Sequence, residues 1–84
     1  VIDGDTFEIT SGKKIRLNDV YAPEASEDGG SLATTRLKNL IDRKSVKIQE
    51  LYSSYDRVVS EVWRNSDGLH VNQAMRDFGY TKKS

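Results

Sequence analysis

The sequence predicts a small α+β domain, mainly β with helices. Its 84 residues leave room for a single domain. Short segments in which polar and apolar residues alternate are typical of half-buried strands, and they flank segments whose apolar residues recur every three to four positions, which is typical of helices. The predicted order along the chain is strand, strand, helix, strand, strand, helix.

The first two predicted strands cover residues 6–10 and 14–18. They are joined by a turn at 11–13 and form a hairpin. Because side chains alternate between the two faces of a strand, Arg16 should point away from the core. The core-facing residues of the hairpin are then Phe7, Ile9, Ile15 and Leu17.

Pro23 ends this strand region, and residues 25–30 form a loop rich in Ser, Gly and acids. Ser31 is the expected N-cap of a helix that continues to about Asp42. The helix is amphipathic, with one apolar face made by Ala33, Leu37, Leu40 and Ile41.

The second half of the chain is again predicted to contain two strands followed by a helix. A strand is predicted from 46 to about 51, and a second strand at 57–63 carries apolar residues on both faces, which indicates a central position. A turn at 65–68 leads into a short helix over 71–78. Gly79 should close that helix as a left-handed cap.

Composition excludes several classes of function. The chain has no Cys, so disulfides, thiol catalysis and zinc–thiolate sites are ruled out. No apolar run approaches the ~18 residues of a membrane span, and no signal peptide opens the sequence. Because Val1 leads directly into an acidic turn, and the chain stops soon after the last helix, we expect residues 1–84 to be one domain truncated at both ends.

Charge is balanced in total but not along the chain. The 13 basic and 13 acidic residues cancel, yet residues 1–30 carry a net charge of −4 and residues 31–84 carry +4. Five basic residues crowd one short stretch, either as a solvated helix face or as a patch for a polyanion. These are Arg36, Lys38, Arg43, Lys44 and Lys47.

The acidic turn Asp3-Gly4-Asp5-Thr6 contains two carboxylates, which suit a hard cation such as Ca²⁺. An EF-hand loop counted from Asp3 would need Gly sixth and Glu twelfth, where this chain has Glu8 and Lys14. That motif is therefore absent. Asp3 could equally cap the turn through its own carboxylate.

Several short motifs in order resemble the staphylococcal nuclease (thermonuclease) family. They are Val1-Ile2-Asp3-Gly4-Asp5-Thr6, Ile15-Arg16-Leu17, Ala22-Pro23-Glu24, Tyr55-Asp56-Arg57, Val71-Asn72 and Gly79-Tyr80. The resemblance runs over nearly the whole chain. It implies a five-stranded OB-fold barrel with helices packed on it, and cleavage of DNA or RNA phosphodiesters with calcium.

The resemblance also implies roles for individual residues. Asp5 would bind the calcium ion, and Glu24 would orient or deprotonate the attacking water. Arg16 and Arg57 would hold the phosphate and stabilise its growing charge. Tyr55 would contact a neighbouring phosphate or sugar. The expected substrate is single-stranded DNA or RNA.

The sequence departs from the family at a calcium-binding Asp, where it has Tyr21. Loss of that carboxylate predicts weak calcium binding, unless Asp19 replaces it. Tyr21 also favours a second interpretation, in which the chain is a non-catalytic OB-fold module that binds nucleic acid or a protein partner. Asp56 stands where the family often has Gly, and Asp tolerates a positive φ better than most residues.

Other family features lie outside the sequence. Most of the first barrel strand and the C-terminal helix are missing, which leaves an unpaired sheet edge, so we allow for a homodimer that exchanges strands. Many relatives are secreted or held in the cell envelope, but the compartment of this protein stays open.

Overall fold

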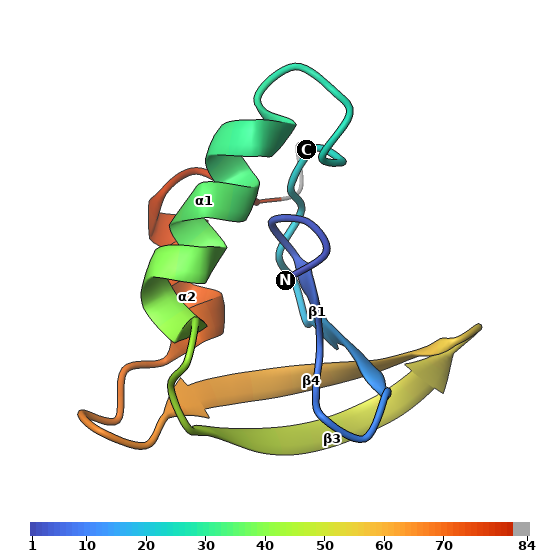
Figure 1. Ribbon diagram of the computed structural model, residues 1–84, viewed down its shortest axis with the longest axis vertical. Helices are drawn as coiled ribbons and strands as arrows, with labels where there is room; N and C mark the ends of the chain where they lie inside the picture. Colours follow the sequence, from blue (N-terminus) through green and yellow to red (C-terminus); the bar gives the residue numbers. More distant parts are fainter. Residues whose placement is uncertain (82–84) are drawn as a thin grey trace.

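The computed structural model describes residues 1–81, which form a four-stranded mixed sheet and two helices (Figure 1). The order of elements is the predicted one. The elements are β1 (Thr6–Glu8), β2 (Lys14–Leu17), α1 (Gly30–Ile41), β3 (Val46–Ser54), β4 (Arg57–Arg64) and α2 (Val71–Asp77). Lys82 and Lys83 of the basic half lie outside the described residues. Within residues 1–81, neither helix is long and apolar enough to cross a membrane.

The strands lie in the order β1-β2-β4-β3. β1 with β2 and β3 with β4 form antiparallel pairs, whereas β2 and β4 run parallel. The chain therefore leaves β2, passes through α1 and β3, and returns along β4 beside β2. The central position predicted for the strand at 57–63 is confirmed. Within residues 1–81 the sheet is not closed into a barrel, and the α+β fold is consistent with an incomplete OB-like domain.

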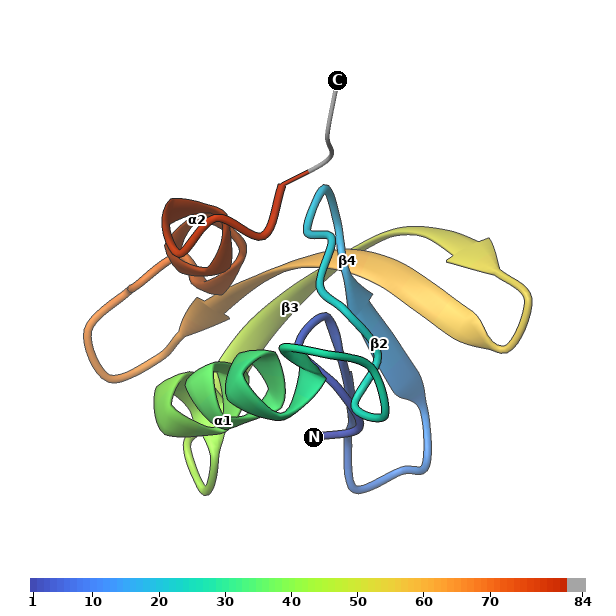
Figure 2. The same cartoon turned by 90° about the horizontal axis from the view of Figure 1, so that it is seen from above.

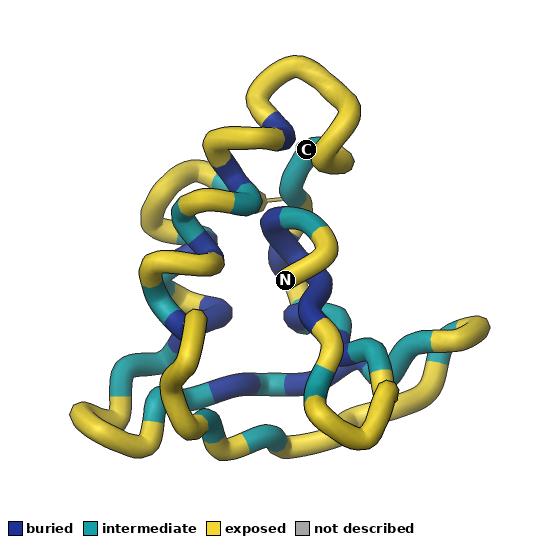
Figure 3. Tube along the Cα trace, in the orientation of Figure 1, coloured by how far each residue is buried: buried dark blue, intermediate teal, exposed yellow. Residues whose placement is uncertain are grey.

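The core lies between the sheet and the helices, which both pack on one side of the β3–β4 ribbon (Figures 1 and 2). Figure 3 shows the buried residues along the facing surfaces of these elements. Three of the four hairpin residues expected in the core are there, while Ile9 is only partly buried against it. The buried cluster consists of Phe7, Ile15, Leu17, Val20, Leu37, Ile41, Val62, Val71 and Met75.

Two boundaries differ from the predictions. α1 begins at Gly30, so Ser31 lies inside its first turn and the N-cap is Gly29, which has a φ of 81° and offers no side-chain cap. β3 continues to Ser54, beyond the expected end near residue 51, because its pairing with β4 carries on across a bulge between Glu50 and Tyr52.

The end of α2 also differs in part. Gly79 has a φ of 104°, which confirms the predicted left-handed residue after the helix. Phe78, the last residue of the predicted helix, is 48% exposed, because the helix ends at Asp77 and Phe78 forms its C-cap. Its ring lies 4.3 Å from the guanidinium carbon of Arg36, which turns this aromatic into a surface cation–π partner.

Candidate active site

The parallel pairing of β2 and β4 places two predicted site residues on one face of the sheet. Arg16 pairs with Val59, and Arg57 lies two residues before Val59 on the same strand. Residues two apart on a strand share a face, so both arginines lie opposite the buried residues Ile15 and Leu17. A pocket of about 390 Å³ opens there, lined by Arg16, Ser54, Tyr55, Asp56 and Arg57.

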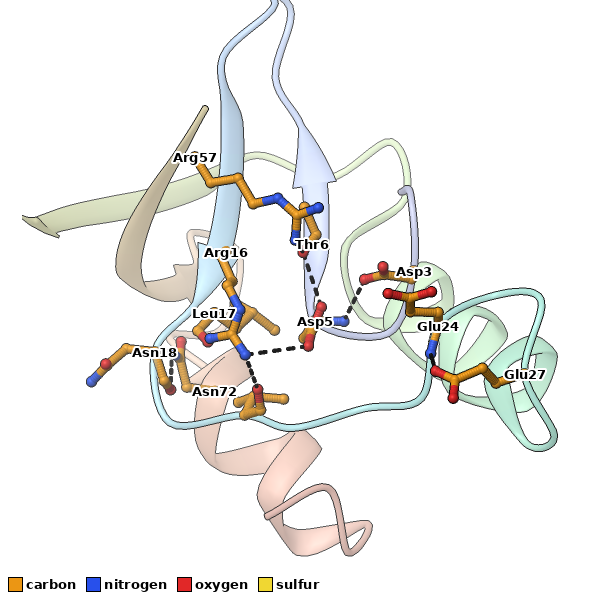
Figure 4. Close-up of polar contacts among 11 residues, drawn as sticks. Asp3, Asp5, Thr6, Arg16, Leu17, Asn18, Glu24, Glu27, Arg57 and Asn72 are labelled. Carbon is orange, nitrogen blue, oxygen red and sulfur yellow. Dashed lines mark hydrogen bonds and ion pairs between the residues drawn. The ribbon is translucent and has the colours of Figure 1, made fainter. Parts of the chain in front are cut away.

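Thr6 connects these arginines to the acidic turn (Figure 4). Its hydroxyl donates a hydrogen bond to Oδ1 of Asp5 at 2.9 Å and accepts one from Nη1 of Arg57 at 3.4 Å. Nη2 of Arg16 lies 3.5 Å from Oδ2 of the same Asp5. We call Asp5, Thr6, Arg16 and Arg57 the Asp5 cluster. Thr6 was not among the predicted residues, although strand alternation puts it on the face of Arg16, its partner in β2.

Asp5 is an acid held in an unfavourable environment. It is 8% exposed, and burial raises its pKa from 3.8 to about 6, helped by the hydrogen bond and the charge of Asp3. The Thr6 hydroxyl and the Arg16 guanidinium lower the pKa but do not offset these effects. At pH 7 the carboxylate therefore carries a charge that its surroundings compensate incompletely.

The guanidinium of Arg16 is held from several sides. It donates hydrogen bonds of 3.3 Å to the carbonyl oxygens of Leu17 and Val20, besides the ion pair with Asp5. It also lies 5.4 Å from the centre of the Tyr21 ring, within cation–π range. These contacts give the guanidinium a fixed orientation while its side chain stays 25% exposed.

Tyr21 therefore occupies the corner where the resemblance expects a metal-binding carboxylate. It is 41% exposed, and its backbone N–H donates to the carbonyl of Tyr80 at 3.0 Å. Asp19, the suggested substitute, is exposed and has a φ of 58°. Within residues 1–81, no three Asp, Glu, His or Cys side chains come close enough to form a metal-binding group.

Glu24 lies apart from the contacts of the Asp5 cluster. Figure 4 shows it on the Asp3 side of Asp5, with Arg16 on the other side. Its backbone N–H donates to Oε1 of Glu27 at 2.8 Å, which fixes the loop, whereas its own carboxylate is exposed. A Cβ atom at Gly30 would lie 1.7 Å from the Glu24 carbonyl oxygen, so only glycine allows α1 to begin this close to the loop.

Tyr55 and Arg57 come from the tip of the β3–β4 hairpin. Tyr55 is fully exposed and has a φ of 57°, so the positive φ considered for Asp56 falls on its neighbour instead. Asp56 instead lies 3.6 Å from Nε of Arg57 and 3.1 Å from Nζ of Lys14. The guanidinium of Arg57 thus lies between the Asp56 carboxylate and the Thr6 hydroxyl.

The motif residue Asn72 is structural, and we call its contacts the Asn72 clamp. Its Oδ1 accepts a hydrogen bond from the Val62 N–H at 2.8 Å. Its Nδ2 donates to the carbonyls of Asn18 and Ser60, both at 3.0 Å. The amide therefore ties α2 to β4 and to the segment that leads from β2 toward Tyr21.

Comparison with known proteins finds similar sequences. The sequence profile described as "Staphylococcal nuclease homologue" matches residues 14–83. An "Uncharacterized endonuclease" of Escherichia coli is 37% identical over 79 residues, which cover 89% of this chain and 51% of that protein. "Protein ParB" of Escherichia coli is 32% identical over 71 residues, which cover 80% and 40%.

"Micrococcal nuclease" of Shigella flexneri is 36% identical over 53 residues, which cover 60% of this chain and 30% of that protein. The chain thus spans about half or less of the length of these curated relatives. The profile match covers most of the sequence, from β2 through α2. The chain therefore belongs to the family of staphylococcal nuclease homologues.

Proposed function

We propose that the protein hydrolyses phosphodiester bonds of nucleic acid at the Asp5 cluster. The observation that carries this proposal is the placement of Arg16 and Arg57 on one face, beside a common pocket and joined through Asp5 and Thr6. Membership of a nuclease family and the nuclease names of two relatives support the same class of reaction.

The two arginines bind the phosphate of the substrate. Hydrolysis adds an oxygen nucleophile to an already anionic phosphorus, so the transition state carries additional negative charge. A guanidinium offers paired donors that match two phosphate oxygens, and fixed donors of this kind need little reorganisation during the reaction. Arg16 is the better fixed of the two, because two carbonyls, Asp5 and Tyr21 hold it.

Glu24 positions the attacking water. Its carboxylate has no hydrogen-bond or ion-pair partner within residues 1–81, so it is available to accept a proton from water. Tyr55, fully exposed at the hairpin tip, contacts the phosphate or sugar of a neighbouring nucleotide. These assignments follow the family motifs and agree with the exposure of both side chains.

The residues fit a weak calcium site. Asp5 is a buried carboxylate whose raised pKa reflects incomplete compensation of its charge, which a cation would supply. Calcium affinity rises with the number of charged ligands, and Tyr21 contributes none at its corner. Asp5 would hold the ion, which when bound supplies positive charge for the phosphate oxygens.

A non-catalytic module that binds nucleic acid or a protein partner is the second candidate. One observation favours it: Tyr21 stacks with Arg16 where the family has a metal-binding acid. Such a module would still bind single-stranded DNA or RNA through the two arginines. The module would not cut the strand that it binds.

Degradation of end-labelled single-stranded DNA, with Ca²⁺ and then with chelator, separates the two candidates. We expect cleavage with calcium and a loss of about 10²-fold or more in Glu24→Gln. Binding without cleavage, or an unchanged rate in Glu24→Gln, would favour the binding module.

The homodimer with exchanged strands remains a prediction, which a measurement of the mass in solution by light scattering tests.

A further inference from the structure

Tyr52 is a large aromatic residue that strand alternation alone would turn away from the arginines. Ile48 packs against the core, and regular alternation would place Glu50 and Tyr52 on its side of the sheet. The bulge changes this register. Glu50 pairs with Ser60 and Tyr52 pairs with Val59, so the extra residue between them moves Tyr52 to the opposite face.

That opposite face is the one that carries the proposed active site. Val59 is the β4 residue whose neighbour in β2 is Arg16, and Arg16 in turn pairs with Thr6. Tyr52, Val59, Arg16 and Thr6 thus form one row across all four strands. With strands about 4.8 Å apart, the Cα atoms of Tyr52 and Arg16 are about 10 Å apart.

Tyr52 offers an exposed aromatic ring, whereas its pairing partner Val59 is covered. Tyr52 is 59% exposed. Val59 is 3% exposed although it is not part of the core cluster, toward which Val58 and Val62 pack. Ser54, two residues along β3 from Tyr52, lines the pocket of the two arginines, so this surface continues the pocket.

We propose that Tyr52, which pairs with the buried Val59 on this face, is a stacking surface for a nucleobase of the nucleic acid whose phosphate Arg16 and Arg57 hold. This inference rests on the proposed function and adds a specificity-determining residue to it. A tyrosine ring stacks on any base, so the contact selects strand state rather than sequence. Bases paired in a duplex are not free to reach the ring, and the site therefore prefers single strands.

Equilibrium binding of a fluorescent oligothymidylate to the full chain tests this inference. The Glu24→Gln background slows cleavage during the measurement. Adding Tyr52→Ala should weaken binding about tenfold, since stacking on one aromatic side chain typically contributes that much or more. Tyr52→Phe should bind within twofold of the parent. Phe78→Ala, which removes another exposed aromatic far along the chain, serves as the matched control and should also stay within twofold.

An oligonucleotide of the same length with abasic sugars distinguishes stacking from a general loss of structure. Tyr52→Ala should bind it as the parent does, because no base is present to stack. Equal losses on both ligands, or no loss on oligothymidylate, would overturn the inference, as would a parent protein that binds neither. Cleavage by the unmodified protein is measured separately. If the protein cleaves but Tyr52→Ala has no effect on binding, only the stacking surface is contradicted. If binding depends on Tyr52 but no cleavage occurs, only the proposed hydrolysis is contradicted.

Discussion

The Asp5 cluster and the Asn72 clamp both bury polar side chains, but they balance charge differently. Neither leaves a buried side-chain nitrogen or oxygen without a hydrogen bond within residues 1–81. The clamp is a neutral amide whose three hydrogen bonds of 2.8 to 3.0 Å all go to backbone groups. The Asp5 cluster instead buries a carboxylate whose pKa is raised to about 6.

This difference separates a group that supports the fold from a group that costs stability. A buried amide with all its bonds made fixes the elements around it. A buried acid with a raised pKa destabilises the folded state wherever it is ionised, and such groups concentrate at functional sites. The Asn72 clamp therefore has a structural role, and the environment of Asp5 supports the role proposed for it.

The largest effect is expected from Arg57→Lys. Lysine keeps the positive charge but loses the paired donors, so cleavage of single-stranded DNA should fall by about 10²–10³ in kcat. Single-turnover cleavage measures this loss. Arg64→Lys is the matched control on the same strand, since Arg64 donates to Asp67 and the Leu40 carbonyl rather than to the cluster. Equal losses in the two variants would contradict the assignment of Arg57.

Asn72→Ala should have the largest effect on stability. It leaves the buried N–H of Val62 without a partner and removes one of the two hydrogen bonds that the Asn18 and Ser60 carbonyls each accept, which should lower the free energy of unfolding by roughly 3 kcal/mol. Urea denaturation measures the change. Gln73→Ala, one residue away and exposed, should change it by less than about 0.5 kcal/mol. A small effect of Asn72→Ala would mean that the clamp does not support the fold.

Asp5→Asn should stabilise the protein. The pKa of this carboxyl is about 6 in the folded protein, compared with 3.8 for an ordinary Asp. The folded state therefore holds more protons than the unfolded state between these two pH values. Stability falls as pH rises through that window and is lowest above it. Removing the charge should raise the unfolding free energy by about 2 kcal/mol at pH 7 in chelator, with little gain at pH 4. Denaturation across this pH range measures it.

Asp67 should change stability with pH in the opposite direction to Asp5, because its pKa is lowered rather than raised. The hydrogen bond from Arg64 lowers its pKa to about 2, so its contribution to stability is present above pH 4 and is lost as pH falls toward 2. Asp67→Asn should therefore flatten the acid side of the stability curve and leave the window between pH 4 and 6 unchanged. A change in that window would show that the pH dependence there does not belong to Asp5.

The smallest effect is expected from Tyr21→Asp. A second carboxylate should tighten calcium binding by about tenfold, because affinity follows the charge of the ligands. Calorimetric titration with Ca²⁺ measures the change, and Tyr21→Phe, which keeps the ring against Arg16, should bind as the parent does. If calorimetry finds the same affinity in Tyr21→Asp, position 21 does not face the ion.

Much of the fold was accessible from the sequence, because local pattern determines local structure. Alternation located the hairpin and put Arg16 on the face away from the core, and apolar spacing located both helices. The pairing of β2 with β4 was not predicted, since it joins residues about 40 positions apart and leaves no local signal. That pairing is what brings Arg16 and Arg57 together.

The same limit applies to the finer parts of the site. The bulge that turns Tyr52 toward Val59 depends on how β3 meets β4, and alternation within β3 points the other way. The hydroxyl of Thr6 matters only because Arg57 reaches it from another strand. The motifs singled out Asp5, Arg16 and Arg57, which the structure brings together, while their roles stay predictions and the contacts of Tyr21 required the structure.

The most direct test of the account is the cleavage of end-labelled single-stranded DNA by the wild-type chain and by Asp5→Asn in the same calcium buffer. We expect the wild type to cut the strand and the more stable Asp5→Asn protein to cut it at least about 10²-fold more slowly. No cleavage by the folded wild type, or equal rates in the two proteins, would contradict it.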